Sequence, residues 1–218
     1  MRNALACGAR YAPNAKPRHV RYIGVVSPPS NDDWSTRHSV RATARRTAAL
    51  VNALTAEPVP DPAAIAGLLL DHGESGPLEL TADDVVGMRA AALRLREVFA
   101  AGHVDEAAGV LNRLLREGTG PLRLSSHDGR SPWHPHLDSD DEAPWGEWLL
   151  ASSCMALTVL LWEGQRPPGG LCSSPSCGDV FLTVGSGPER RYCSRRCATR
   201  ERVAAHRRAK AGAGSRTP

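Results

Sequence analysis

Two closely spaced pairs of cysteines near the C-terminus constrain the fold more than any other feature of this sequence. Cys172 and Cys177 form the first pair, Cys193 and Cys197 form the second, and fifteen residues separate the pairs. Zn²⁺ prefers a tetrahedron of soft ligands, and each short-range pair can supply one edge of it. The spacing therefore predicts one zinc ion bound by four thiolates. Because the protein fills all four positions, such a site is structural rather than catalytic.

The residues around the two pairs predict a small treble-clef-like finger. Residues 179–183 are typical of a short strand, and the Gly and Pro residues of Gly185–Pro188 predict a turn after it. Residues 190–192 are then expected to form the second strand of a hairpin. From residue 193 to about residue 210 no Gly or Pro interrupts the chain, which predicts a helix. Two disulfides in an exported protein are the alternative, but residues 1–22 lack the apolar core of a signal peptide.

The finger segment, residues 172–208, resembles the zinc finger of the CGNR family, which is named for a Cys-Gly-Asn-Arg tetrapeptide at its last ligand. The corresponding residues here are Cys197, Ala198, Thr199 and Arg200, so the first and last match and the middle two differ. The four cysteines, Phe181, Arg191 and the basic helix also look like the family pattern.

Two short stretches upstream, 50–54 and 111–112, are similar to signatures of the helical ABATE domain that precedes the finger in that family. The family is described as stress-induced transcriptional regulators. The resemblance therefore implies DNA binding by the finger and a regulatory role for the domain before it.

The rest of the sequence predicts a mainly α fold: a helical N-terminal domain with one β-hairpin, followed by the small treble-clef-like finger with its four cysteines. Apolar residues recur at helical spacing in five stretches, with Asp61 and Thr81 as the expected N-caps of the second and third. The turn-forming residues 127–130 lie between two strand-like segments, 122–126 and 131–137.

These elements define the expected domain organisation. We expect a disordered basic leader over residues 1–40, a helical ABATE-like domain over 41–164, a linker over 165–170, the finger over 171–211 and a disordered tail over 212–218. Cys154 falls in the last apolar helix of the domain and is expected in its core.

Charge is distributed unevenly between the two domains. Residues 47–171 carry eight Lys and Arg against eighteen Asp and Glu, whereas residues 172–218 carry ten against three. An acidic domain repels nucleic acid and a basic finger attracts it. The sequence therefore predicts that the finger, and not the helical domain, contacts DNA.

The helix after Cys193 carries most of this positive charge, and Glu201 is the one acid between residues 190 and 210. Arg196, Arg200 and Arg207 fall on one helix face. The alternatives are a solvated helix, or a helix that docks an acidic partner or this protein's own middle domain. Arg200 has the further alternative role of bracing the zinc knuckle, the turn between Cys172 and Cys177, through backbone carbonyls. The predicted DNA-binding residues are Arg195, Arg196, Arg200, Arg202, Arg207 and Arg208.

A second cluster of polar side chains lies in the predicted hairpin, where Trp133, His134 and His136 are candidates to line a ligand pocket. Exposed imidazoles are an equal alternative. With Asp138 the histidines also form a His-x-His-x-Asp spacing used by metal-dependent hydrolases, but Ser139 stands where that motif needs a further histidine. We therefore expect no enzymatic activity.

The expected function is that of a zinc-finger DNA-binding transcription regulator. Its helical domain would sense a small-molecule ligand or a partner, or form a homodimer; the alternative is a zinc-stabilised protein-interaction module that does not bind DNA. Cysteines in a metal-like cluster favour a reducing compartment, so we expect a cytoplasmic location. We expect no membrane contact, since the longest apolar run, 148–162, is shorter than the about 18 residues of a typical span.

Overall fold

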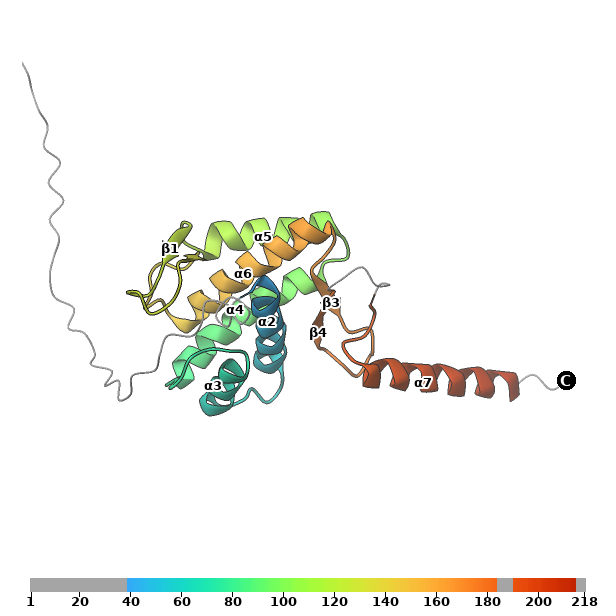
Figure 1. Ribbon diagram of the computed structural model, residues 1–218. Coiled ribbons are helices and arrows are strands. Elements are labelled where there is room, and N and C mark those ends of the chain that lie inside the picture. Colours follow the sequence, from blue (N-terminus) through green and yellow to red (C-terminus); the bar gives the residue numbers. More distant parts are fainter. Residues whose placement is uncertain (1–38, 184–189, 215–218) are drawn as a thin grey trace, which may run out of the picture.

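The computed structural model describes residues 39–183 and 190–214, and it confirms a mainly helical fold (Figure 1). Most of the expected leader, 1–38, and the last tail residues, 215–218, lie outside the described residues. The helices of the N-terminal domain are α2 (Val40–Thr55), α3 (Pro62–Asp71), α4 (Ala82–Ala100), α5 (Val104–Gly118) and α6 (Trp145–Gly164).

Side-chain caps set the starts of these helices where the sequence predicted them. The Asp61 carboxylate accepts a hydrogen bond from the backbone N–H of Ala64, at 2.8 Å. Thr81 and Asp84 form a reciprocal capping box, in which each side chain accepts a hydrogen bond from the other residue's backbone N–H. A capped first turn satisfies N–H groups that have no partner inside the helix. The predicted caps of α3 and α4 are therefore confirmed.

Helix α6 is the central element of the core. It packs against α4, α2 and α5, and Leu149, Cys154 and Leu157 are fully buried. It spans 20 residues, and by length and composition alone it could cross a membrane. Its contacts with three neighbouring helices identify it instead as a core helix. Burial raises the pKa of the Cys154 thiol to about 12, so this cysteine is an inert core residue.

The predicted hairpin forms at one end of the helical body. Strands β1 (Arg123–Ser125) and β2 (His134–His136) pair antiparallel, with Ser125 opposite His134 and Arg123 opposite His136. His127, Asp128 and Gly129 in the connection all have positive φ, which explains the tight reversal. Both strands are shorter than predicted, and the longer connection places His127 beside the strand histidines.

The finger's own hairpin differs from the sequence-based prediction. Strand β4 (Val180–Leu182) pairs antiparallel with β3 (Gly169–Leu171), which the sequence assigned in part to a linker. Residues 190–192, predicted as the partner strand, form no strand; Arg191 contributes a carbonyl that accepts a hydrogen bond from the Ser173 N–H. Gly169 and Gly170 indicated a flexible linker from sequence alone, but in the fold their lack of side chains lets β3 lie close to neighbouring residues.

The β3–β4 hairpin is part of the helical body rather than separate from it. Asn52 on α2 accepts a hydrogen bond from the Val180 N–H at 2.7 Å and donates one to the Val180 carbonyl at 3.1 Å. Val180 and Phe181 are buried, and Val180 belongs to the main hydrophobic cluster. Asn52 thus occupies the place of a neighbouring strand.

Replacing Asn52 by Ala is expected to lower the free energy of unfolding by about 2 kcal/mol. The change leaves a buried N–H and a buried carbonyl of Val180 without partners, and each such group costs about 1–3 kcal/mol. Chemical denaturation of the zinc-loaded protein measures the difference. The exposed Asn112→Ala on α5 is the matched control, and equal stability of the two variants would contradict the role of Asn52.

Helix α7 (Arg195–Gly214) projects away from the helical body at the end opposite the β1–β2 hairpin (Figure 1). It extends four residues beyond the predicted end near Lys210.

Candidate metal centre, basic helix and histidine pocket

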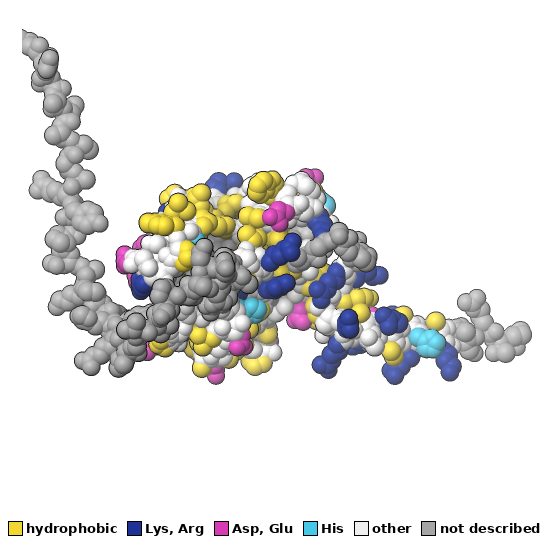
Figure 2. Space-filling view, viewed as in Figure 1, with side chains coloured by type: hydrophobic (Ala, Val, Ile, Leu, Met, Phe, Trp, Pro, Cys, Tyr) yellow, Lys and Arg dark blue, Asp and Glu magenta, His cyan; other side chains and the backbone are white. Residues whose placement is uncertain are grey.

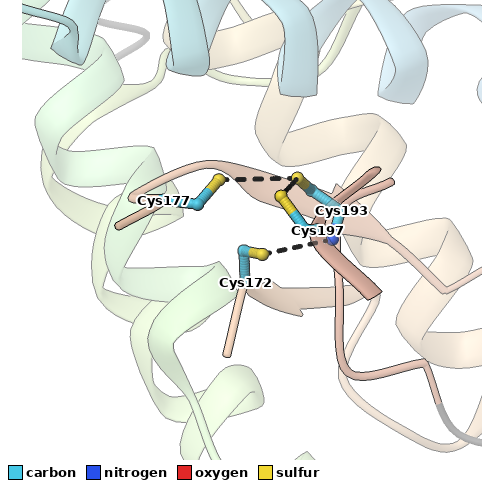
Figure 3. A group of neighbouring side chains, drawn as sticks. All are labelled: Cys172, Cys177, Cys193 and Cys197. Atoms are coloured by element: carbon cyan, nitrogen blue, oxygen red, sulfur yellow. Dashed lines mark hydrogen bonds between the residues drawn. The ribbon is translucent and has the colours of Figure 1, made fainter. Parts of the chain in front are cut away.

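Four cysteines from two separate segments converge at the base of α7 (Figure 3). Cys172 follows β3 directly, and a turn closed by a hydrogen bond from the Cys177 N–H to the Ser174 carbonyl brings Cys177 back toward it. Cys193 precedes α7, and Cys197 lies in its first turn. The fold therefore brings together all four predicted ligands.

The sulfur positions fit a tetrahedral zinc ion. The Cys193 Sγ lies 3.6 Å from the Cys177 Sγ and 3.7 Å from the Cys197 Sγ, and all four sulfur atoms lie within 4.8 Å of one another. Zn–S bonds of about 2.3 Å in a tetrahedron place sulfur atoms about 3.8 Å apart. Only small shifts would complete the site.

The backbone around the sulfur atoms already favours negative charge at one ligand. Burial would raise the pKa of the Cys172 thiol, but the backbone N–H groups of Cys193 and Ser174 point at its sulfur and lower the pKa overall. Burial raises the pKa of Cys193, and the neighbouring thiol of Cys177 raises it further. The pKa values of the two thiols are therefore shifted in opposite directions. A bound metal ion would stabilise the thiolate form of all four cysteines.

Arg200 lies against the zinc knuckle. Its Nη2 donates to the Ser174 Oγ at 2.8 Å and to the Cys197 Sγ at 3.3 Å. Ser174 is buried and donates in turn to Glu201 at 2.6 Å. A guanidinium beside a thiolate ligand offsets part of the negative charge of a four-thiolate site. The structure therefore favours the bracing role of Arg200 over a primary contact with DNA.

The other predicted DNA-binding arginines lie free of the knuckle. Figure 2 shows Lys and Arg side chains along the length of α7, which extends into solvent. Glu201 is directed to Ser174 and does not offset them. The exposed arginines of this helix, apart from Arg200, are Arg195, Arg196, Arg202, Arg207 and Arg208.

Comparison with known proteins identifies the C-terminal segment. Residues 170–210 match the model of the CGNR zinc finger family. A search of curated proteins found no match to the chain. The matched segment begins within β3 and includes all four cysteines, so it includes most of the strand that the sequence assigned in part to a linker. The family match and the sulfur geometry together support a structural zinc ion in this finger.

A cavity with a volume of about 810 Å³ lies at the other end of the body, between α2, the β1–β2 hairpin and the start of α6. The three residues predicted to line a pocket, Trp133, His134 and His136, all line it. Trp133 is 72% exposed, whereas the His136 side chain is only 10% exposed. The imidazole of His136 is therefore not a solvated surface group.

The hydrolase-like arrangement of His134, His136 and Asp138 does not form a ligand set. Asp138 is 3% exposed and its carboxylate accepts from the His136 Nδ1, at 3.1 Å, and from Arg123. It therefore holds one histidine in place and does not lie beside both as a third ligand. The third side chain at the two histidines is His127, which the sequence assigned to a turn.

Asp141 holds His127 in the same way. Its Oδ2 lies 3.1 Å from the His127 Nδ1, and it also accepts from Ser125 at 2.7 Å and from Arg123 at 2.6 Å. Burial would raise the pKa of Asp141, but the hydrogen bonds from Ser125 and Arg123 and the charges around it lower that pKa to about 2. Asp141 is therefore a carboxylate across the physiological pH range. His127 and Asp141 were not predicted as site residues, because only the folded hairpin brings them to the strand histidines.

Proposed function

We propose that the protein is a zinc-finger DNA-binding transcription regulator whose basic helix α7 contacts the DNA backbone. The observation that carries this proposal is the projection of α7 from the body with five exposed arginines that do not brace the zinc site. Phosphate contacts by Lys and Arg release condensed counterions and supply most of the non-specific affinity for DNA. The match of residues 170–210 to the CGNR zinc finger supports the same function.

The acidic body favours one orientation on DNA. Residues 47–171 carry an excess of ten acidic side chains over basic ones, so this part of the protein is repelled by phosphates. Because α7 extends away from the body, it can approach a duplex without bringing the acidic surface close to it. The acidic body and the basic helix α7, which are distinct segments of the sequence, are thus also apart in the fold.

We further propose that the helical domain is an ABATE-like sensing domain that binds a small molecule in the cavity at the β1–β2 hairpin, or a partner or second copy of the chain. The cavity size falls in the range of small-molecule sites, and an exposed tryptophan lies at it. As proposed, the protein works in the cytoplasm and regulates by binding without catalysing a reaction. A zinc-stabilised finger that docks an acidic protein is the competing function.

Arg207→Glu is expected to weaken binding to duplex DNA of every sequence and to flatten its dependence on salt. Removal of one phosphate contact reduces the slope of log K against log salt concentration by about 0.9. Fluorescence anisotropy with labelled duplexes at several salt concentrations measures both quantities. The matched control is Arg116→Glu, a charge reversal at an exposed position of α5 on the acidic body.

Arg200→Ala tests whether Arg200 stabilises the zinc site or contacts DNA. Because Arg200 bonds to Ser174 and to a ligand sulfur, its loss is expected to weaken zinc binding about 10-fold or more. Its effect on DNA affinity should then follow the zinc content. Binding of duplex DNA by Arg207→Glu as tight as that of the parent protein at low salt would reject α7 as the DNA contact and favour the protein-docking function.

A further inference from the structure

Three histidine side chains of the β1–β2 hairpin direct their Nε2 atoms at one point. The His134 Nε2 lies 2.8 Å from that of His136 and 3.2 Å from that of His127. One ligand atom from each of the three lies within 4.8 Å of the others. This cluster belongs to the cavity at the opposite end of the body from the cysteines.

The other nitrogen of each ring already has an acceptor. The Nδ1 atoms of His136 and His127 lie 3.1 Å from carboxylate oxygens of Asp138 and Asp141. The Nδ1 atom of His134 lies 2.8 Å from the carbonyl oxygen of Pro132. Carboxylates and carbonyls accept hydrogen bonds and donate none, so each Nδ1 carries the hydrogen. A carboxylate or carbonyl behind each imidazole is the arrangement that orients metal-bound histidines.

It follows that the Nε2 lone pairs of His127 and His136 both lie within hydrogen-bonding distance of the His134 Nε2. A cation placed between the three rings would accept all three lone pairs at once, as in a metal site with three histidine ligands. Three nitrogen ligands at about 2.05 Å in a tetrahedron lie about 3.3 Å apart, close to the spacing found. A transition-metal ion therefore fits with only a small expansion of the cluster.

The surroundings of the cluster also attract a cation. Among the described residues, the cavity lining includes one arginine, Arg46, which is paired with Glu74. Low-dielectric walls lined by one sign of charge raise the local concentration of the opposite ion. The remaining acidic residues of the lining are Asp84, Asp138, Asp140, Asp141 and Glu142, of which Asp138 and Asp141 are paired with Arg123.

We propose that His127, His134 and His136 bind a second divalent transition-metal ion, of the kind that imidazole favours such as Zn²⁺, with an open coordination position toward the cavity. Three protein ligands and one free position distinguish this site from the closed site of four cysteines. The open position would take a nitrogen or oxygen donor of a small molecule. That last step rests on the proposed sensing role of the cavity, whereas the metal site itself does not.

Metal content of the full-length protein tests the site. After loading with excess Zn²⁺ and gel filtration, the parent protein is expected to hold two zinc ions per chain. His127→Asn is expected to hold one, since Asn tolerates the positive φ of 50° at this position. His103→Asn is the matched control, because Asn can replace the His103 side chain as the N-cap of α5, and it should hold two.

Co²⁺ substitution distinguishes the two sites by their visible absorption, since thiolate and imidazole ligands give different spectra. The imidazole-type bands are expected to disappear in His127→Asn and to remain in Cys193→Ser. Imidazole added as a probe should shift them if the fourth position is open; unchanged bands would reject the open position while leaving the metal site intact.

One zinc ion per chain in the parent protein under excess Zn²⁺ would overturn the proposal, and this result requires no variant to fold. A second zinc ion retained by His127→Asn would overturn it as well, because the ion would then bind elsewhere. Neither measurement involves DNA, so the metal site and the DNA-binding function succeed or fail separately.

Discussion

Cys193→Ser is expected to release the structural zinc and to unfold the knuckle together with α7. The finger offers little apolar core of its own, and structural zinc supplies about 10–16 kcal/mol of apparent binding energy in small fingers. Cys193 lies beside two of the other three sulfur atoms, and its backbone N–H donates to the Cys172 Sγ at 3.4 Å. Its loss therefore disturbs all the remaining ligands.

Unfolding is expected to stop at the β3–β4 hairpin. Val180 and Phe181 are buried, and Asn52 holds the Val180 backbone from α2. Hydrogen exchange should show loss of protection in residues 172–178 and 193–210, with protection kept at Val180 and in α2, α4 and α6. Far-ultraviolet circular dichroism should lose only the contribution of α7.

Ser176→Ala provides the control for the cysteine change. Ser176 lies next to a ligand in the same knuckle, but its side chain is exposed. This variant is expected to keep its zinc and its exchange pattern. Zinc content equal to that of the parent in Cys193→Ser would exclude the four-thiolate site. Loss of protection throughout the body would show that the metal stabilises the whole chain.

The helices and their caps could be predicted because their signals are local. Asp61 and Thr81 satisfy N–H groups only three residues away, and apolar residues at helical spacing indicate which faces pack. The four zinc ligands could be predicted for the same reason, since the two cysteines of each pair lie only a few residues apart in sequence. Only the joining of the two pairs required long-range folding.

The strand pairing of the finger could not be predicted in the same way. Gly169 and Gly170 have the composition of a linker, and nothing near them in sequence shows that Phe181 will lie opposite. Residues 190–192 follow the turn-forming segment Gly185–Pro188 in sequence, so a local hairpin was the simpler interpretation. Contacts with α2 and α4 decide the outcome, because they bury β4 in the body.

At the histidine cluster and at the zinc knuckle, too, the sequence predicted the local pattern but not the contacts made between distant residues. His134 and His136 were predicted to line a pocket because alternate residues of a strand face one side. His127 joins them only because the turn has positive φ at three successive residues, which the sequence pattern did not reveal. Arg200 belongs to the predicted basic face of α7, yet its contact with Ser174 depends on the folded knuckle.

Gly169→Ala is expected to lower the free energy of unfolding by about 3 kcal/mol, the upper end of the usual cost of overpacking. A Cβ at this position would lie 2.0 Å from the Phe181 carbonyl oxygen and 2.7 Å from the Phe99 ring. Neither neighbour can move freely, because Phe99 is 1% exposed in the core and Phe181 is in a paired strand. The hairpin would have to shift away from α4.

Zinc binding is expected to survive this change, since Gly169 lies outside the loop that carries the first two ligands. The combination of lower stability and normal zinc content would show that the docking of the hairpin and the closure of the metal site contribute separately. Chemical denaturation with zinc present, together with metal analysis, measures both. Gly109→Ala is the control: nothing lies within 4 Å of a Cβ there, and Ala in the interior of α5 should add about 1 kcal/mol. Stability of Gly169→Ala equal to that of the parent would mean that β3 does not pack on α4.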